Sequence, residues 1–368
     1  MKHILCFLLM LGLLVHSAEW QQAPQGHVLT FPKDHGSHAG QKIEWWYFTG
    51  NLIDSSNHAF GYQLTFFRIG TDPKPENPST WTVRDLHMAH FAISDVSGGK
   101  YYCAQRLGRS GPGLAGALED RLRAWNGTWT AEMTGENQIK LSATAEDGKV
   151  PFGLQLDMNS TRPIVAHGEG GYSRKGQQPG NASIYYSFTR LKSQGAITLG
   201  KERFDVTGLS WMDHEFGTSF LEPGQIGWDW FSLQLDDGSD LMLFQIRQLN
   251  SAVPPSMSGT LVSPQGQVTN LRPGDFKLES SDPWKSPVTT AAYPLKWNIS
   301  VPTANLTLTT TTKLKEQEMH SPKAGPSYWE GAIEATGTLD GKPINGRGYL
   351  EMTGYAGASM RSFFHGPE

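Results

Sequence analysis

The chain has 368 residues and a formal net charge of −4, with 35 acidic and 31 basic side chains. This near balance argues against nucleic acid or an anionic membrane surface as a partner, and it leaves a small or uncharged ligand as the expectation. The content of 41 Gly, 22 Pro, 12 Trp, 11 Tyr and 17 Phe predicts an all-β protein of many short strands joined by tight turns.

The N-terminus has the pattern of a secretory signal peptide over residues 1–17. Lys2 precedes an apolar run from Ile4 to Val15, and cleavage is expected before Ala18. The run is shorter than the ~20 apolar residues that a membrane-spanning helix needs, so no transmembrane segment is expected after cleavage. The sequence therefore predicts a secreted or periplasmic protein.

The mature chain is longer than one hydrophobic core usually serves, so two domains are expected. An extended, polar lead-in over residues 18–41 would be followed by units at 42–220 and 221–368. Cleavage leaves Cys103 as the only cysteine, which excludes an internal disulfide and argues against a cysteine-based metal site. No metal or other cofactor is expected.

The first unit opens with a predicted hairpin of strands 43–50 and 61–69. Alternation along its second strand places Tyr62, Leu64, Phe66 and Arg68 on one face and Gln63, Thr65 and Phe67 on the other. Both faces are partly aromatic, as in a barrel whose interior receives a ligand. The next strand, 81–94, carries His87 and His90 on opposite faces. We expect both to be ordinary hydrogen-bonded strand histidines, with His90 the better candidate for lining a cavity.

One short helix is predicted at 113–125, because Leu114, Leu118 and Leu122 are spaced by four. Strands resume at 127–133, 138–144, 152–158, 183–190 and 203–211. The glycine-rich segment 167–176 lacks the ending of a phosphate-binding loop and the context of a dinucleotide fingerprint. It is interpreted as a mobile loop, a candidate cover for a cavity mouth.

The second unit repeats the pattern of the first. A Trp-rich strand at 227–235, a polar turn and an aromatic strand at 240–247 predict another hairpin, whose closing Arg247 corresponds to Arg68 in the first. Further strands are expected at 257–263, 268–278, 293–301, 304–312, 328–337 and 343–355.

Carboxylates, one histidine and tryptophans are concentrated between Trp211 and Trp230. If the strand before this stretch continues through Glu215, alternation places Trp211, Asp213 and Glu215 on one face and His214 on the other. These acids could simply cap a loop or pair with arginines. Charges kept beside indole rings nevertheless need partners or a function, which makes the stretch a candidate site.

Several motifs, spread over essentially the whole mature chain, resemble the AttH/CrtC-type lipocalin-like family. They are Glu44-Trp-Trp-Tyr-Phe-Thr-Gly50, Thr65-Phe-Phe-Arg68, His90-Phe-Ala-Ile-Ser-Asp95, Trp211-Met-Asp-His-Glu-Phe-Gly217, Gly227-Trp-Asp-Trp-Phe231 and Tyr328-Trp-Glu-Gly331. The family includes carotenoid 1,2-hydratase, also called hydroxyneurosporene synthase, and exported proteins described as predicted secreted hydrolases. The resemblance implies two consecutive lipocalin-like antiparallel β-barrels that hold an apolar, isoprenoid- or lipid-like ligand inside.

The resemblance also implies a hydratase that needs no cofactor, and this chain keeps the Asp-His pair of the hydratase as Asp213-His214. In that hypothesis Asp213 protonates a C=C bond, His214 orients a carboxylate or water, and Asp229 is a second acid or base. The candidate substrate-binding residues are Trp45, Tyr47, Phe66, His90, Trp211, Glu215, Trp228 and Trp230. Each aromatic residue among them has barrel-core packing as its alternative role.

Two other functions stay open at this stage. A non-catalytic carrier of a hydrophobic ligand would use the same aromatic residues, with Asp213 and Glu215 paired to Arg68 or Arg84. A secreted hydrolase is the least favoured, because the sequence has no Gly-x-Ser-x-Gly elbow, no His-Glu-x-x-His motif and no clear pair of glycosidase carboxylates.

Overall fold

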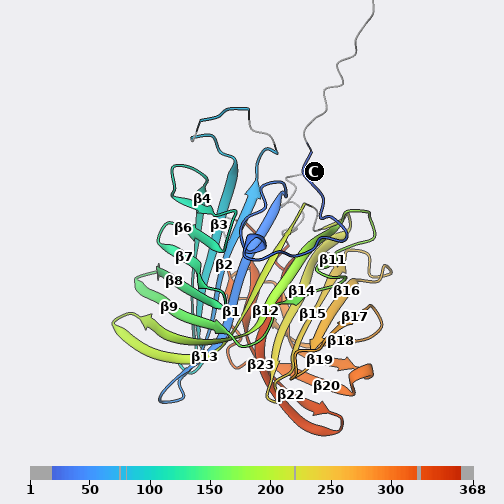
Figure 1. Cartoon of the computed structure of the whole chain (residues 1–368). Coiled ribbons are helices and arrows are strands. Elements are labelled where there is room, and N and C mark those ends of the chain that lie inside the picture. The colour runs from blue at the N-terminus through green and yellow to red at the C-terminus, as the bar shows by residue number, and fades with distance from the viewer. Residues whose placement is uncertain (1–18, 74–75, 80, 219–220, 321–324, 358–368) are drawn as a thin grey trace, which may run out of the picture.

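The computed structural model describes residues 19–73, 76–79, 81–218, 221–320 and 325–357. The regular structure of the described residues is almost entirely antiparallel strand, gathered into two large curled sheets that stand side by side (Figure 1). The first sheet curls into a barrel and the second into a half-barrel, which confirms the predicted all-β, lipocalin-like architecture. The predicted signal peptide lies outside the described residues.

The first sheet has the strand order β4-β3-β2-β1-β13-β12-β9-β8-β7-β6-β5, and two short strands, β10 and β11, pair with β12. Its strands are β1 (Ile43–Asp54), β2 (Ala59–Gly70), β3 (Asp85–Asp95), β4 (Lys100–Arg109), β5 (Ala115–Ala117), β6 (Arg123–Asn126), β7 (Trp129–Gly135), β8 (Gln138–Asp147), β9 (Val150–Ser160), β10 (Val165–Ala166), β11 (Tyr172–Arg174), β12 (Ala182–Leu199) and β13 (Glu202–Gly217). The long strands β12 and β13 pair over most of their length.

The second sheet has the order β17-β16-β15-β14-β23-β22-β20-β19-β18, with β21 paired to β22. Its strands are β14 (Gln225–Leu235), β15 (Asp240–Gln248), β16 (Ser256–Val262), β17 (Val268–Leu271), β18 (Lys277–Lys285), β19 (Ala292–Val301), β20 (Leu306–Thr311), β21 (Glu318–Met319), β22 (Tyr328–Leu339) and β23 (Lys342–Met352). Each sheet thus consists of strands contiguous in sequence.

Each sheet encloses its own core, because alternate side chains of every strand point to the concave side. In the first barrel Trp46, Phe48, Tyr62, Leu64 and Phe66 pack together with residues of β3, β6 to β9, β12 and β13. The face of β2 that carries Tyr62, Leu64 and Phe66 therefore points inward, into a core filled by side chains.

A third apolar cluster joins the convex sides of the two sheets. Tyr47, Tyr185 and Trp211 of the first sheet pack against Trp230 and Phe244 of the second. Polar contacts cross the same interface: Trp230 Nε1 donates to Tyr185 OH at 3.0 Å, and Gln234 Nε2 donates to the Thr189 carbonyl at 2.7 Å. The two halves of the molecule are therefore packed on each other rather than tethered.

The helix predicted at 113–125 is wrong. The segment forms the hairpin of β5 and β6, with Ala115 opposite Asn126. Leu114 is 65% exposed whereas Leu122 is fully buried, so the leucines spaced by four do not share one face. Pairing of β6 with β7 outweighs the helical spacing.

The lead-in before β1 wraps against the first barrel and includes the short 3₁₀ turn η1 (Lys33–His35). Asp34 and His35 are buried, and His35 Nδ1 lies 2.7 Å from Tyr186 OH. Gly36 is required here, because a Cβ would stand 2.5 Å from the Glu119 carbonyl carbon. In the second sheet, η2 (Pro302–Ala304) is a similar short turn between β19 and β20.

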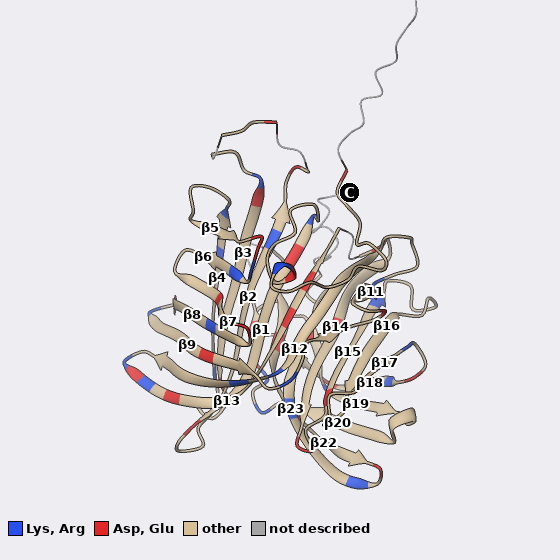
Figure 2. Ribbon diagram, viewed as in Figure 1, with Lys and Arg blue, Asp and Glu red and all other residues tan. Residues whose placement is uncertain are grey.

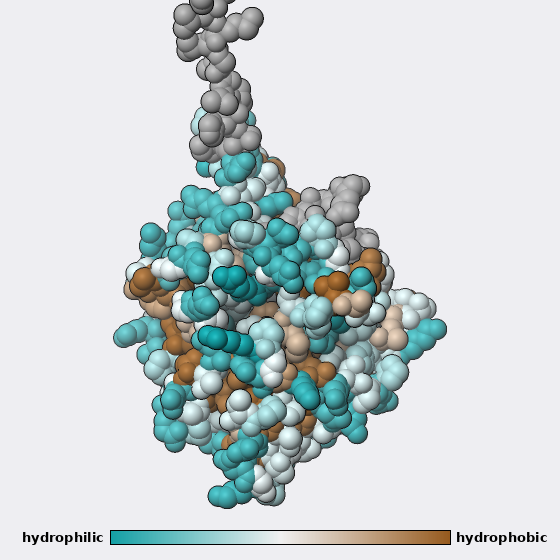
Figure 3. Space-filling model, turned by 90° about the vertical axis from the view of Figure 1, so that its right-hand side faces the viewer, coloured by the Kyte–Doolittle hydropathy of each residue, from teal (hydrophilic) through white to brown (hydrophobic). Residues whose placement is uncertain are grey.

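Charged residues occupy unusual positions for strands. Figure 2 shows acidic residues part-way along the central strands. Buried acids within strands include Glu44, Asp213, Glu215, Asp229 and Glu330, and Glu351 is partly buried. The face drawn in Figure 3 is mostly hydrophilic, with apolar residues in small groups. Among the described residues, no helix has the length and apolar content needed to cross a membrane.

Candidate functional site

A cavity of about 90 Å³ lies between the two sheets, outside both barrel cores. That is well above the ~10–15 Å³ that one water molecule requires. Aromatic and apolar side chains from both sheets form most of its wall: Trp45, Tyr47, Phe67, Met88, Trp228, Trp230, Phe244 and Ile246. Strand alternation fills the concave faces with core side chains, and this cavity lies where the convex faces of the two sheets meet.

Asp213, on β13, is the acid most tightly held by its surroundings. Its Oδ2 accepts a hydrogen bond from Tyr185 OH at 2.7 Å, and its Oδ1 accepts from Trp211 Nε1 at 2.6 Å and from the Ser187 hydroxyl. Burial raises the pKa of Asp213 to about 7, against the effect of these three donors and with a smaller contribution from Glu215. Near neutral pH both ionisation states are accessible.

Two further acids come from the second sheet. Glu351 lines the cavity and accepts from Trp228 Nε1 at 3.0 Å, and burial raises the pKa of its carboxyl to about 7. Glu330, opposite Glu351 in the β22–β23 ladder, is buried, and burial together with Glu351 holds its pKa well above the ordinary value. Burial and these two carboxyls also raise the pKa of Tyr47. Asp213 and Glu351 thus face one hollow from opposite sheets.

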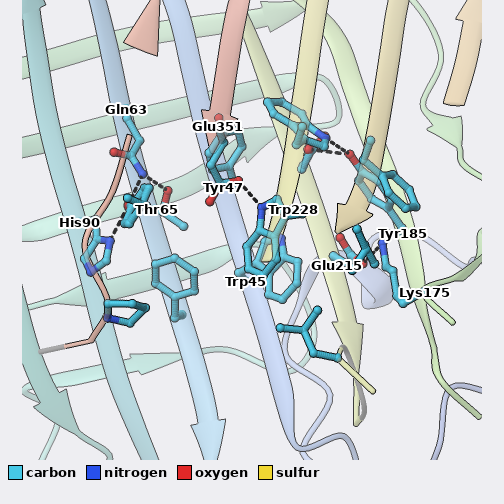
Figure 4. A pocket seen from close by; sticks show the side chains of 18 of the residues that line it. Trp45, Tyr47, Gln63, Thr65, His90, Lys175, Tyr185, Glu215, Trp228 and Glu351 are labelled. Atoms are coloured by element: carbon cyan, nitrogen blue, oxygen red, sulfur yellow. Dashed lines mark hydrogen bonds and ion pairs between the residues drawn. The ribbon is translucent and has the colours of Figure 1, made fainter. Parts of the chain in front are cut away.

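The two ends of the cavity carry different polar groups (Figure 4). At one end Lys175 Nζ lies 2.5 Å from Glu215 Oε1, so this buried acid is paired. At the other end Tyr328 OH lies 2.6 Å from His90 Nδ1 and accepts from Gln63 Nε2 at 2.9 Å. Burial lowers the pKa of His90 to about 3, so its imidazole is neutral.

Six of the predicted substrate-binding residues line this cavity: Trp45, Tyr47, His90, Glu215, Trp228 and Trp230. Trp211 stands behind the wall, where it donates to Asp213. Phe66 does not reach the cavity, because it lies on the concave face of β2, in the barrel core. Its neighbours Thr65 and Phe67 have the opposite parity and line the cavity instead.

Two of the predicted catalytic residues also point elsewhere. His214 lies on the other face of β13, where Nε2 contacts Glu44 Oε1 at 2.9 Å. Asp229 pairs with Arg247 at 3.1 Å and accepts from Tyr355 OH at 3.0 Å on the side of β14 away from the cavity. Because side chains alternate along a strand, His214 lies on the opposite face of β13 from Asp213, and Asp229 lies on the opposite face of β14 from Trp228 and Trp230.

His38, Glu44 and His214 are the three residues whose geometry comes nearest to a metal site in the described part of the chain. Their donor atoms lie within 4.8 Å of one another, but His38 Nδ1 and His214 Nε2 stand only 2.7 and 2.9 Å from the same Glu44 oxygen. Ligands of a tetrahedral ion with bonds of ~2.0–2.1 Å would be ~3.3 Å apart. The contacts are those of a hydrogen-bonded network, to which Arg68 adds a cation 3.7 Å from Glu44.

Sequence reasoning missed Lys175, Tyr185 and Ser187, which lie around Asp213. Tyr185 and Ser187 lie on β12, and Asp213 lies on β13. They come together only because the two strands pair in a register that places Ser187 opposite Asp213. This proximity could have been predicted if strands 183–190 and 203–211 had been identified as a hairpin and their register had been assigned. The aromatic residues and carboxylates of the last strand pair left Glu351 open between a second cavity and a pair with Arg347; in the structure it lines this cavity from the far end of the chain.

Fold and site together define an all-β protein of two lipocalin-like sheets with an acid-bearing, aromatic cavity between them. The chain belongs to the AttH-like family, whose model matches residues 22–355. A crystal structure assigned as an AttH from Nitrosomonas europaea is 34% identical, covers 91% of this chain and 99% of its own, and superposes with a TM-score of 0.81.

Kievitone hydratases are more distant relatives. The enzyme of Fusarium solani subsp. phaseoli is 21% identical over 224 residues, which is 60% of this chain and 61% of that protein. The chain therefore matches less than two thirds of the length of this curated relative. A crystal structure of kievitone hydratase from Nectria haematococca has the same fold, with a TM-score of 0.68 at 15% identity, over 91% of this chain and 96% of its own.

Proposed function

We propose that this protein is a cofactor-independent hydratase that adds water to a C=C bond of an apolar, isoprenoid- or lipid-like molecule bound between the two sheets. The observation that carries the proposal is Asp213, a buried carboxyl whose pKa is raised to about 7, beside a cavity walled by indole and phenol rings. The distant likeness to kievitone hydratase supports the same class of reaction.

In the proposed reaction the Asp213 carboxyl transfers its proton to one alkene carbon and becomes a carboxylate. The other alkene carbon becomes a tertiary cation, water forms a C–O bond to it, and the proton released by that water returns to Asp213 or passes to Glu351. The net change is alkene plus water to alcohol. General acid catalysis of this kind contributes ~10²–10⁴-fold to a rate.

The aromatic wall suits a cationic intermediate. Trp45, Tyr47, Trp228 and Trp230 all line the cavity, and a desolvated cation–π contact contributes ~2 kcal/mol, or roughly thirtyfold in rate for each ring that acts in the transition state. Hydrogen bonds from both second-sheet indoles, to Glu351 and to Tyr185, fix the orientation of these rings.

Substitution of the acid tests the proposal. Asp213→Asn keeps the size of the side chain and is expected to reduce hydration at least ~100-fold, measured as mass gain of one water on kievitone and on acyclic isoprenoid alkenes. Asp157→Asn, at a 58% exposed side chain on β9, is the matched control and is expected to retain full activity. Unchanged turnover in Asp213→Asn would end the acid assignment.

A non-catalytic carrier is the second candidate, because the three donors that engage Asp213 would serve equally to anchor a buried acid in a binding wall. Recovery of an unaltered apolar ligand from the exported protein, with no water added on incubation, would favour it.

A hydrolase is not supported by the Ser187–His167 contact of 2.7 Å, since the Ser187 hydroxyl is fully buried and donates to Asp213. Export to the periplasm or medium remains part of the proposal and rests on the N-terminal pattern.

A further inference from the structure

A second line of polar contacts leads away from Asp213 into the interface between the sheets. Asp213 Oδ1 is bonded to the Ser187 hydroxyl, Ser187 Oγ lies 2.7 Å from His167 Nε2, and His167 Nδ1 lies 2.8 Å from Thr260 Oγ1. All four residues are at most 4% exposed. The chain of contacts starts on β13, crosses β12 and the turn after β10, and ends on β16 of the second sheet.

The turn that carries His167 is built to hold it in this line. Its backbone N–H donates to the Tyr185 carbonyl at 3.0 Å, and the Gly171 N–H closes the turn on the His167 carbonyl at 3.0 Å. Gly168 has φ of +66°, and a Cβ there would stand 2.3 Å from the Tyr172 carbonyl oxygen. The glycine-rich segment that was predicted to be a mobile loop therefore forms a hydrogen-bonded turn that inserts a histidine behind the candidate acid.

A neutral imidazole has one N–H donor and one acceptor, so His167 has two ways to fit between Ser187 and Thr260. With the proton on Nε2, His167 donates to Ser187, the Ser187 hydroxyl donates to Asp213, and Asp213 is a carboxylate. With the proton on Nδ1, His167 donates to Thr260 and accepts from Ser187. The Ser187 oxygen is then free to accept from Asp213 Oδ1–H, and Asp213 is a carboxylic acid.

We infer that His167 is a positioning residue for Asp213, and that its two tautomers keep the buried acid and its partners fully hydrogen bonded in both ionisation states. The inference rests on the proposed function, in which Asp213 gives up and regains a proton in each cycle. Without such a partner, one of the two states would leave a buried donor or acceptor unpaired, at a cost that would oppose the cycle.

The charges around this line are consistent with a neutral His167. Lys175 is the cation that acts on it, and burial with Lys175 lowers the pKa of His167 to about 3. The Tyr185 ring lies 4.2 Å from the imidazole. Glu215 on the same strand contributes to the raised pKa of Asp213. The charge of Asp213 in turn contributes to the raised pKa values of Glu330 and Glu351 on the second sheet and of Tyr47 on β1.

Thr260→Val tests the inference from the far end of the line. The substitution keeps the shape of the side chain. It removes the acceptor of His167 Nδ1–H in one tautomer and the donor to the bare Nδ1 in the other, and a buried unpaired N–H is the costlier of the two losses. The arrangement that pairs with protonated Asp213 is therefore the more disfavoured. The ionisation midpoint of Asp213 is expected to fall by about one pH unit, a tenfold change in its equilibrium. Thr260→Ser retains the hydroxyl and is expected to leave the midpoint unchanged.

The midpoint is measured by ¹³C NMR of the aspartate carboxyls, with Asp213→Asn used to assign the signal. Equal midpoints in Thr260→Val and Thr260→Ser would overturn the inference. The effect must also travel through Ser187, so in a Ser187→Ala background the difference between the two Thr260 variants is expected to vanish. A difference that persists there would mean that Thr260 acts on Asp213 by another route, and the inference would fail.

The two proposals can fail separately. If the protein hydrates an alkene, the high-pH limb of kcat in Thr260→Val is expected to move down by the same unit as the NMR midpoint, with KM little changed. A loss of stability alone would lower the amount of folded protein and would not move that limb. If no hydration is found in the native protein, the proposed function fails while the NMR comparison still decides the role of His167.

Discussion

A carboxyl that is only 4% exposed and accepts three hydrogen bonds has its ionisation decided by its surroundings. At Asp213 burial disfavours the carboxylate, and the donors Ser187, Tyr185 and Trp211 favour it. The opposition leaves the pKa near neutrality, where a general acid is most useful at ordinary pH.

The pH dependence of hydration follows from this residue. Since Asp213 must be protonated to act as the acid, kcat is expected to be highest below its pKa of about 7 and to fall roughly tenfold per pH unit above it. A pH profile of kcat on any turned-over alkene measures the limb. A rate that stays level well above neutrality would show that another group supplies the proton.

Glu351 gives a prediction about stability. Its pKa in the folded state is raised to about 7, so its contribution to stability is complete below the pKa of the unfolded chain and is lost as pH rises toward 7. Glu351→Gln keeps an acceptor for Trp228 and removes the buried charge. Above pH 7 the variant is expected to be more stable than the native protein, by about 3 kcal/mol.

Urea unfolding of the two proteins at several pH values checks this expectation. Below pH ~4.3, where the native Glu351 is protonated in both states, the two free energies of unfolding should converge. A difference that is the same at low and high pH would assign the effect to packing rather than to charge.

At the scale of the strand, β13 shows how far alternation carries a prediction. Parity correctly placed Asp213 and Glu215 on one face and His214 on the other, and the two faces meet different surroundings: the cavity, and the Glu44 network against the lead-in. Parity could not say which face is the concave one. Both faces of β2 are partly aromatic, and Phe66, which was predicted to bind the substrate, lies in the core whereas Phe67 lines the cavity.

Other strands were missed for reasons of context. The strand Lys100–Arg109 carries half-buried residues on both faces at the edge of the sheet, so it has no clean alternation to read. The hairpin at 115–126 forms because its second strand, β6, pairs with β7 of the sheet. Neither circumstance is visible in the local sequence.

The contact of β15 with the first sheet rests on a buried ion-pair cluster. Asp240 is fully buried, and Arg162 and Arg190 each approach it to 2.6 Å. Asp240→Ala leaves two guanidinium groups unpaired and is expected to destabilise the protein by about 3–5 kcal/mol in thermal or urea unfolding.

The exposed pair Lys140–Asp157, with side chains 62% and 58% exposed, provides the comparison. Asp157→Ala is expected to change stability by no more than ~1 kcal/mol, because water screens both charges. Equal losses in the two variants would show that the Asp240 cluster contributes no more than a surface pair.

For the whole molecule, the sequence predicted the all-β class, both hairpins and the density of acids beside indoles. It did not predict where the hollow lies, because the cavity is formed by faces of strands that are far apart in sequence, such as β3 and β23. The partners of Asp213 were missed for the same reason: Tyr185, Ser187 and His167 approach it only after β12 pairs with β13.

The fit between the two sheets is expected to control ligand binding. Gly61 on β2 leaves no room for a side chain, since a Cβ would stand 2.8 Å from Ala332 Cβ and 2.5 Å from Tyr349 OH on the second sheet. Gly61→Leu is therefore expected to part the sheets and weaken binding of an apolar fluorescent dye at least tenfold, with little change in the β-sheet circular dichroism.

Gly135→Ala is the control for this substitution, because the nearest atom to its Cβ is the end of the Gln138 side chain at 3.2 Å. Dye binding in that variant should match the native protein. Undiminished binding in Gly61→Leu would place the dye somewhere other than between the sheets.

The separation of the cavity from both packed interiors has an evolutionary consequence. The residues that line the cavity are not members of the buried cluster inside either sheet, so substitutions at the cavity wall are expected to leave those two cores unchanged. Proteins with this architecture can therefore acquire new chemistry through substitutions in the wall of the cavity between the sheets, while the cores of the two sheets stay unchanged.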